Sequence, residues 1–338
     1  MKKLIAALGI GISLVALYLA LRDIHFDQVA AAFGHINPAI FALAVLPWLV
    51  AIASKVFRWR LLYHPDEALA PYPRLTAALL IGYLFNTVLP LRTGEVVRAT
   101  VLRATAGLPV ARTLSTILVE KVLDTMALIV ILAAILPFIA LPPAFRGPAV
   151  GAAVAFSGLF VVVLAAALLP NVARAVRDRL LGLLPLRFRP AVVRLSDQVL
   201  DGLRPLRSRA VAPGLVAWTA LSWGANLLSA YLVLGSFGLW LQWTAPALLV
   251  DATNLMMTVP SAPGYVGVYH ATAKESLRVF GVDPDTALAF ATFFHAFGFL
   301  PLALAGLIAM VREGLSWGSV QGGTAGPDSP PAGAPAPR

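Results

Sequence analysis

Three charged residues stand inside an otherwise apolar segment. Glu120, Lys121 and Asp124 fall within residues 113–138, which are long and apolar enough to cross a bilayer. Glu120 and Asp124 are four residues apart, so a helix presents them on one face with Lys121 beside them. Charge at such depth needs a partner or a polar cavity, and it marks a candidate functional site. The three groups either hold a charged ligand or form a buried ion-pair network with an arginine, and the sequence leaves both readings open.

A second charged cluster follows a break in an apolar segment at Pro90-Leu-Arg-Thr-Gly94. A helix that starts after Gly94 places Glu95 in its first turn, where the helix dipole favours a carboxylate. A guanidinium binds two phosphate oxygens at once, so we expect Arg92 and Arg98 to contact a lipid phosphate. The alternative is that both arginines only pair with the neighbouring carboxylates of Glu95, Glu120 and Asp124.

The second half of the chain contains a matching break. Pro260-Ser-Ala-Pro-Gly264 repeats the Pro-x-x-x-Gly pattern, and an asparagine precedes each break, Asn86 in the first and Asn254 in the second. Two matching broken segments in a polytopic membrane protein usually meet at a substrate site. The candidate binding residues of the second segment are Asp251, Asn254, Pro260, Gly264, Tyr265, Tyr269 and His270. Anchoring at the membrane interface would explain the tyrosines equally well, and proton relay is an alternative for His270 and His295.

Composition identifies an integral membrane protein. Of the 338 residues, 59% are hydrophobic and only 12% are charged, whereas a soluble domain is nearer a quarter charged. The net charge of +10 comes mostly from arginines that flank apolar segments, so we expect no nucleic-acid partner. The chain has no cysteine, which excludes disulfides. It also lacks Walker, His-Glu-x-x-His and Gly-x-Ser-x-Gly motifs, so we expect no catalytic residue, metal or cofactor.

The arginines also predict the topology. Candidate full spans are residues 4–21, 38–57, 113–138, 148–169, 211–238 and 287–310. If residues 75–104 dip into the bilayer and return, the arginine-rich loops 58–74 and 171–210 both lie inside, as the positive-inside rule requires. Residues 245–280 must then return to the outside. We therefore expect an all-α polytopic membrane protein with about six full spans and two re-entrant helical hairpins. The inverted-topology repeats would cover about 1–140 and 148–312, with both termini cytoplasmic.

The segments outside this transport domain, residues 1–312, have simpler interpretations. Residues 171–210 are basic and contain an amphipathic pattern at Val192, Leu195, Val199 and Leu203, so we expect binding to anionic lipids of the inner leaflet. Arg58 is assigned to the inner loop. Residues 316–338 are rich in Gly, Pro, Ala and Ser and are expected to be disordered. Four tryptophans near span ends are expected to lie in the membrane interface: Trp48, Trp59, Trp240 and Trp243.

Three sequence runs resemble the signatures of the lysylphosphatidylglycerol synthase transmembrane-region family, also called flippase-like. They are residues 83–98, Val119-Glu-Lys-Val-Leu-Asp124 and residues 260–269, and the resemblance covers about residues 4–312. Lys121 stands where an arginine is more frequent. In the founding members a soluble aminoacyl-transfer domain follows, and it is not expected here. The resemblance implies movement of a lipid between leaflets.

These observations together predict a lipid flippase that is not an enzyme. Its substrate would be a charged phospholipid, a glycolipid or a polyprenyl-phosphate lipid, which crosses through a polar cavity between the hairpins. A membrane-embedded enzyme acting on a lipid or polyprenyl carrier is one alternative, and an anion channel or exchanger is another. The expected location is the cytoplasmic membrane of a bacterium or archaeon, and assembly into a homo-oligomer stays open.

Overall fold

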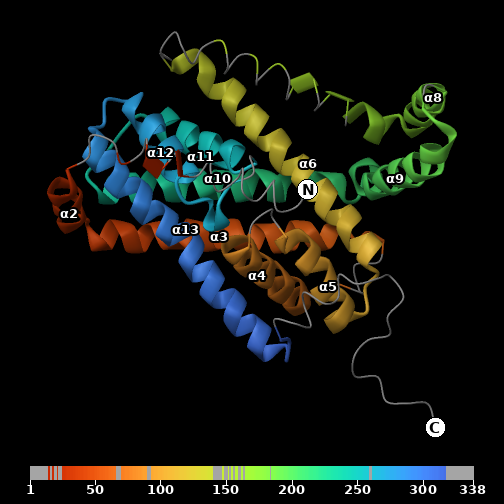
Figure 1. Ribbon diagram of the computed structural model, residues 1–338, viewed down its shortest axis with the longest axis horizontal. Coiled ribbons are helices and arrows are strands. Elements are labelled where there is room, and N and C mark those ends of the chain that lie inside the picture. Colours follow the sequence, from red (N-terminus) through yellow and green to blue (C-terminus); the bar gives the residue numbers. More distant parts are fainter. Residues whose placement is uncertain are drawn as a thin grey trace.

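The protein is all-helical throughout the part of the chain that the structure describes, as predicted. The computed structural model describes residues 14–15, 17–18, 21, 25–65, 70–89, 93–139, 147, 151, 154, 157–158, 161–162, 164–182, 184–258 and 261–316, and no strand occurs among them. Long helices cross one another around two pairs of short helices, while α8 (Pro170–Leu181) and α9 (Arg189–Gly202) extend to one side of the bundle (Figure 1).

Three of the described helices are long and apolar enough to cross a membrane. They are α3 (Pro38–Leu61), α6 (Val110–Ile135, continued to Phe138 by the 3-10 helix η2) and α13 (Pro284–Arg312). Each matches a predicted span and extends it by a few residues. The predicted span 211–238 corresponds to α10 (Ala212–Ser236), a helix of 25 residues without a charged side chain. The predicted spans 4–21 and 148–169 lie largely outside the described residues.

The outer faces of the long helices are apolar and exposed. On α13, Leu300, Leu304 and Leu307 are 46% to 60% exposed, and their spacing of three and four residues places them on one helical face. Leu43, Leu46 and Leu49 form a similar stripe on α3. Contiguous apolar surface of this kind marks contact with lipid or a protein partner, which suits the outer face of a membrane-spanning helix.

Helices α3 and α10 form the most extensive pair among the helices that the structure describes. Small residues meet at two points of their contact surface and let the backbones approach closely, and the rings of Phe57 and Trp218 stack there with centroids 4.8 Å apart. The Ser229 hydroxyl donates to the Ala44 carbonyl at 2.9 Å, and the Ser222 hydroxyl donates to the Ala51 carbonyl at 3.1 Å. The order of these two contacts shows that the helices run antiparallel. Each serine satisfies its own buried hydroxyl while it holds the partner backbone.

Two hairpins of short helices occupy the centre. Hairpin 1 consists of α4 (Tyr72–Val88) and α5 (Gly94–Ala106), and hairpin 2 consists of α11 (Thr244–Met256) and α12 (Val268–Arg278). At about 1.5 Å per residue the four helices measure roughly 25, 20, 20 and 17 Å. The hydrocarbon core is about 30 Å thick, so no single helix of either hairpin reaches across it. Helices of this length are consistent with re-entrant hairpins, which enter the bilayer and return to the same side.

The remaining helices cover the ends of the bundle. Helix α2 (Phe26–Gly34) packs on α13, where the amide of His25 donates to the Asp285 carboxylate at 2.9 Å. The basic region 171–210 contains α8 and α9, which are joined by the Arg177–Asp197 ion pair at 2.7 Å. Val172, Val176 and Leu180 of α8 are exposed with a spacing of four residues. Binding of this apolar stripe to a lipid surface stays a prediction.

Candidate functional site

The tip of hairpin 1 is built on a contact between two glycines. A methyl group on Gly94 would lie 2.1 Å from the Gly82 carbonyl oxygen, so the start of α5 touches the backbone of α4 directly. The side-chain oxygen of Asn86 accepts a hydrogen bond from the Gly94 amide at 2.8 Å. Only glycine permits this close approach, and Asn86 caps the new helix across the turn. Pro90, Leu91 and Arg92 lie outside the described residues.

The tip of hairpin 2 depends on a left-handed backbone conformation that residues other than glycine rarely adopt. Gly264, Tyr265 and Gly267 have φ angles of 65°, 59° and 89° in and after the 3-10 helix η5 (Pro263–Tyr265). The His295 ring nitrogen Nε2 donates to the Gly264 carbonyl at 2.7 Å, which ties this tip to α13. Helix η5 packs on α4, and Gly264 faces the carbonyl of Thr87. The two tips therefore meet. Pro260 lies outside the described residues.

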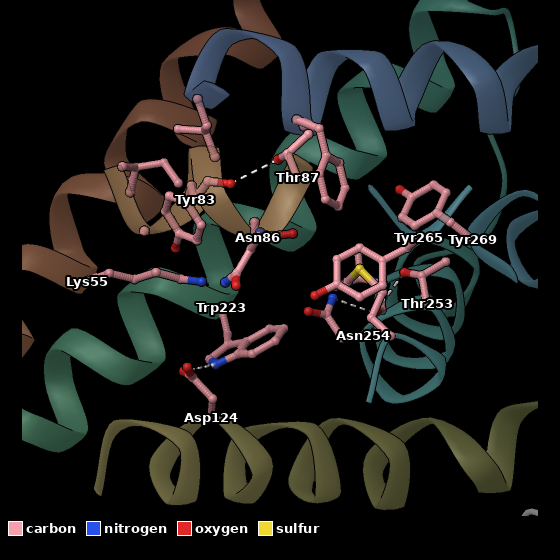
Figure 2. Close-up of a pocket in the computed structure, with 18 of the residues that line it drawn as sticks. Lys55, Tyr83, Asn86, Thr87, Asp124, Trp223, Thr253, Asn254, Tyr265 and Tyr269 are labelled. Atoms are coloured by element: carbon pink, nitrogen blue, oxygen red, sulfur yellow. Dashed lines mark hydrogen bonds between the residues drawn. The ribbon is translucent and has the colours of Figure 1, made fainter. Parts of the chain in front are cut away.

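A polar cavity of about 260 Å³ lies between the hairpins and the walls formed by α3, α6, α10 and α13. Figure 2 shows side chains from both hairpins pointing into it, with Asn86 and Asn254 on facing sides. Of the predicted binding residues, the structure brings the following together in its lining: Asn86, Glu95, Arg98, Glu120, Lys121, Asp124, Asn254, Tyr265 and Tyr269.

Three predicted residues do not line this cavity. Asp251 and His270 are buried within hairpin 2, and no described residue forms a hydrogen bond with either Asp251 oxygen or with His270 Nδ1. Gly264 contributes its carbonyl to His295 instead. The helical register explains the difference for Asp251, because Val250, Thr253 and Asn254 of the same helix take the cavity-facing positions.

Arg98 and Glu120 form a buried ion pair between hairpin 1 and α6. The guanidinium donates to both carboxylate oxygens at 2.6 and 3.2 Å, and the two side chains are only 5% and 3% exposed. The guanidinium also lies over the Trp59 ring, 3.8 Å from its centroid. This two-point contact between guanidinium and carboxylate neutralises both buried charges within the protein. The geometry therefore favours the ion-pair reading for Arg98, with its role in ligand binding still a prediction.

A second pair joins α6 to α3. Asp124 Oδ1 forms an ion pair with Arg58 Nη2 at 2.8 Å and accepts a hydrogen bond from the Trp223 indole nitrogen at 3.2 Å. The assignment of Arg58 to an inner loop was wrong, because α3 continues to Leu61 and the Arg58 side chain is fully buried. The position of Trp59 in the membrane interface was also wrong. Its ring is fully buried and its nitrogen donates to Thr116 at 3.0 Å.

The third pair is Lys121 with Glu95, at 3.0 Å between Nζ and Oε1. Helix α5 begins at Gly94 and Glu95 lies in its first turn, as predicted. Each carboxylate in the cavity wall is thus paired with one cation from a different helix. The three pairs fasten hairpin 1 and α3 to α6.

Sequence reasoning missed several cavity residues: Lys55, Tyr83, Thr87, Trp223, Asn226 and Thr253. For Lys55 a signal was present, since it is a charge inside the predicted span 38–57. The others are single polar or aromatic residues in apolar helices, and only the packing of distant helices shows that they meet.

The fold and this cavity define an all-α membrane protein with charged and amide side chains in a chamber between two helical hairpins. The chain belongs to the lysylphosphatidylglycerol synthase TM region family, whose sequence model matches residues 6–306. It is similar to "Glycosyltransferase AglD" of Haloferax volcanii, with 25% identity over 85% of this chain and 51% of that protein. The chain thus spans about half the length of this curated relative. No solved structure gives a significant match.

Proposed function

We propose that the protein moves a lipid between membrane leaflets, with the polar head group passing through the central cavity while the acyl chains stay in the bilayer. The observation that carries this proposal is a charged and amide-lined chamber of about 260 Å³ inside a helix bundle whose outer stripes are leucine-rich. A water-soluble substrate needs only the chamber. A lipid needs both surfaces, because its two ends have opposite solvation.

The hairpins support the same proposal. Backbone that is not helical is tolerated at membrane depth only where protein or a wet cavity satisfies it. Tips that meet at Thr87 and Gly264 would close the chamber, and their separation would open it. The inverted repeat, the cytoplasmic termini and the location in a cell membrane belong to this proposal. Anionic inner-leaflet lipids would bind the basic region 171–210.

We propose transport rather than catalysis because the carboxylates in the cavity wall are all engaged in ion pairs. A general base needs a carboxylate that is available to a substrate proton. Each of Glu95, Glu120 and Asp124 is instead held by a lysine or arginine. The glycosyltransferase name of the relative comes from a protein about twice as long.

The test uses purified protein in sealed vesicles that contain a lipid with a fluorescent acyl chain. A membrane-impermeant reductant bleaches only the outer leaflet, so protein-free vesicles should retain about half of their signal. Vesicles with the protein should lose more than this half, at a rate that rises with protein content. Ion flux without lipid movement would instead identify a channel and refute the proposal.

A further inference from the structure

Lys55 differs from every other charged side chain that the structure describes in the cavity wall. Those five are paired with one another or with Arg58. Lys55, on α3, makes no ion pair and no hydrogen bond with any described residue, and its Nζ lies 5.9 Å from the centroid of the Trp223 ring. In Figure 2 its amine extends into the chamber toward Asn86. Asp124 and Glu120 attract this amine only from beyond ion-pair distance. A partly buried cation without a contacting partner is costly within a membrane protein, so the site calls for an anion that contacts the amine directly.

The amide of Asn86 adds donors beside this cation. Its oxygen Oδ1 already accepts the hydrogen bond from the Gly94 amide. A backbone N–H can only donate, so this contact fixes the orientation of the side chain. The NH₂ group is left for the chamber. Lys55 and Asn86 thus present an ammonium and an amide NH₂ close together in the cavity wall, as an anionic oxygen requires. The carboxylate on the same hairpin, Glu95, is paired with Lys121.

Asn254, on the facing side, presents an acceptor instead. The Nδ2 group of Asn254 donates to the Val250 carbonyl at 2.8 Å, which can only accept. Its oxygen Oδ1 is left for the chamber, and Figure 2 shows Asn254 facing the space in front of Trp223. An acceptor of this kind binds a neutral donor such as a hydroxyl. The neighbouring Thr253 hydroxyl does not donate to this oxygen, because it donates to the Leu249 carbonyl at 2.7 Å.

We propose that the cavity selects lipids whose head group is a singly charged phosphate diester carrying a neutral, hydroxyl-bearing group, a glycerol or a sugar. Lys55 and Asn86 bind the phosphate oxygens, and Asn254 accepts a hydrogen bond from a hydroxyl beyond it. This assignment rests on the proposed lipid transport and names its substrate class. A cationic head group is repelled by Lys55. A choline head group has no donor for the Asn254 oxygen.

The first experiment compares four lipids with the same fluorescent acyl chain in the vesicle assay: phosphatidylglycerol, a sugar-bearing polyprenyl phosphate, phosphatidylcholine and lysyl-phosphatidylglycerol. At least one of the first two should move about tenfold faster than the last two, and which of them moves decides between a glycerol and a sugar. Lys55→Met should slow the preferred lipid about tenfold to a hundredfold, as expected for the loss of a charge-assisted hydrogen bond. Lys55→Arg should retain most of the rate.

The second experiment measures binding without transport, through the thermal unfolding of the detergent-solubilised protein with glycerophosphoglycerol, a soluble phosphate diester, as probe. The probe should raise the unfolding midpoint of the wild type and of Lys55→Arg, but not that of Lys55→Met. Without the probe, Lys55→Met should unfold at the wild-type temperature or above it, because it removes an unpaired charge. Arg278→Gln is the control, since this exposed cation on α12 pairs with the exposed Glu275 of the same helix.

The outcomes separate the two proposals. If the wild type moves lipids without preference, or Lys55→Met keeps the wild-type rate and selectivity, the head-group assignment is wrong and lipid transport stands. If no lipid moves but the probe stabilises the protein through Lys55, transport is wrong and the anion site stands. If Lys55→Met lowers the midpoint without the probe, Lys55 has a structural role and the assignment fails.

Discussion

The Arg98–Glu120 pair allows a quantitative prediction. Glu120→Gln leaves the Arg98 guanidinium buried, 5% exposed, with an amide in place of the carboxylate that binds it at 2.6 and 3.2 Å. Removing one partner of a buried pair costs about 3–5 kcal/mol. At about 2 °C per kcal/mol, the unfolding midpoint should fall by roughly 6–10 °C. The double variant Arg98→Met/Glu120→Met removes both charges and should recover most of this loss.

The assay is thermal unfolding in detergent at one fixed heating rate, because unfolding of membrane proteins is commonly irreversible and the midpoint then depends on that rate. Arg278→Gln breaks an exposed pair with Glu275 and serves as control, with an expected loss under about 1 kcal/mol. A midpoint for Glu120→Gln within about 1 °C of the wild type, or a double variant no more stable than the single one, would show that solvent reaches this pair and refute the reasoning.

Three further predictions concern other parts of the fold. Gly94→Ala should destabilise hairpin 1 by about 1–3 kcal/mol or more, because the methyl group would overlap backbone atoms; Gly224→Ala, in a helix with open space around it, should be neutral or stabilising. Trp223→Phe should weaken the Asp124 contact and lower the midpoint by about 1 kcal/mol, and an unchanged midpoint would contradict the hydrogen bond. Asp283→Ala should cost about 1 kcal/mol by removing the cap of α13, and this cap should also depend on pH.

The pH dependence follows from the contacts of the Asp283 carboxylate. Partial burial favours the neutral acid, but hydrogen bonds from Thr286 and from the amide of Asp285 outweigh it and hold the pKa of Asp283 below its usual value of 3.8. The stabilisation by a carboxylate with a depressed pKa is complete above about pH 4 and is lost as the pH falls through the folded-state pKa. The difference in midpoint between wild type and Asp283→Ala should therefore shrink below pH 4. A constant difference would show that the charge does not contribute.

The sequence predicted what local pattern controls. Apolar length predicted α3, α6 and α13, and the Pro-x-x-x-Gly patterns predicted where α4 and α11 end. The position of Glu95 in the first turn of α5 also followed from the glycine before it. These features depend on neighbouring residues along one helix, where spacing and backbone preference decide the outcome.

Contacts between distant helices were not predictable in the same way. The span that contains Lys55 was ended before Arg58 because a charge usually marks the membrane boundary. The partner that permits Arg58 to be buried, Asp124, is 66 positions later in the sequence. Trp59 was assigned to the membrane interface because it lies near a predicted span end. In the structure it is buried, where its ring nitrogen donates to Thr116 and its ring face contacts Arg98. Only the packing of α3 on α6 and α10 decides these cases.

The serine bonds between α3 and α10 have a mechanical consequence. Sliding one helix along the other would break both bonds together and leave two hydroxyls unsatisfied. We therefore expect α3 and α10 to move as one rigid pair. Lys55 lies on this pair, one helical turn beyond Ala51. Among the described residues no serine hydroxyl bonds either hairpin to α3 or α10 in this way, and hairpin 1 contacts α3 through the Arg98 guanidinium over the Trp59 ring. A phosphate bound by Lys55 would therefore keep its position in the bilayer while movement of the hairpin tips exposes the cavity first to one side of the membrane and then to the other.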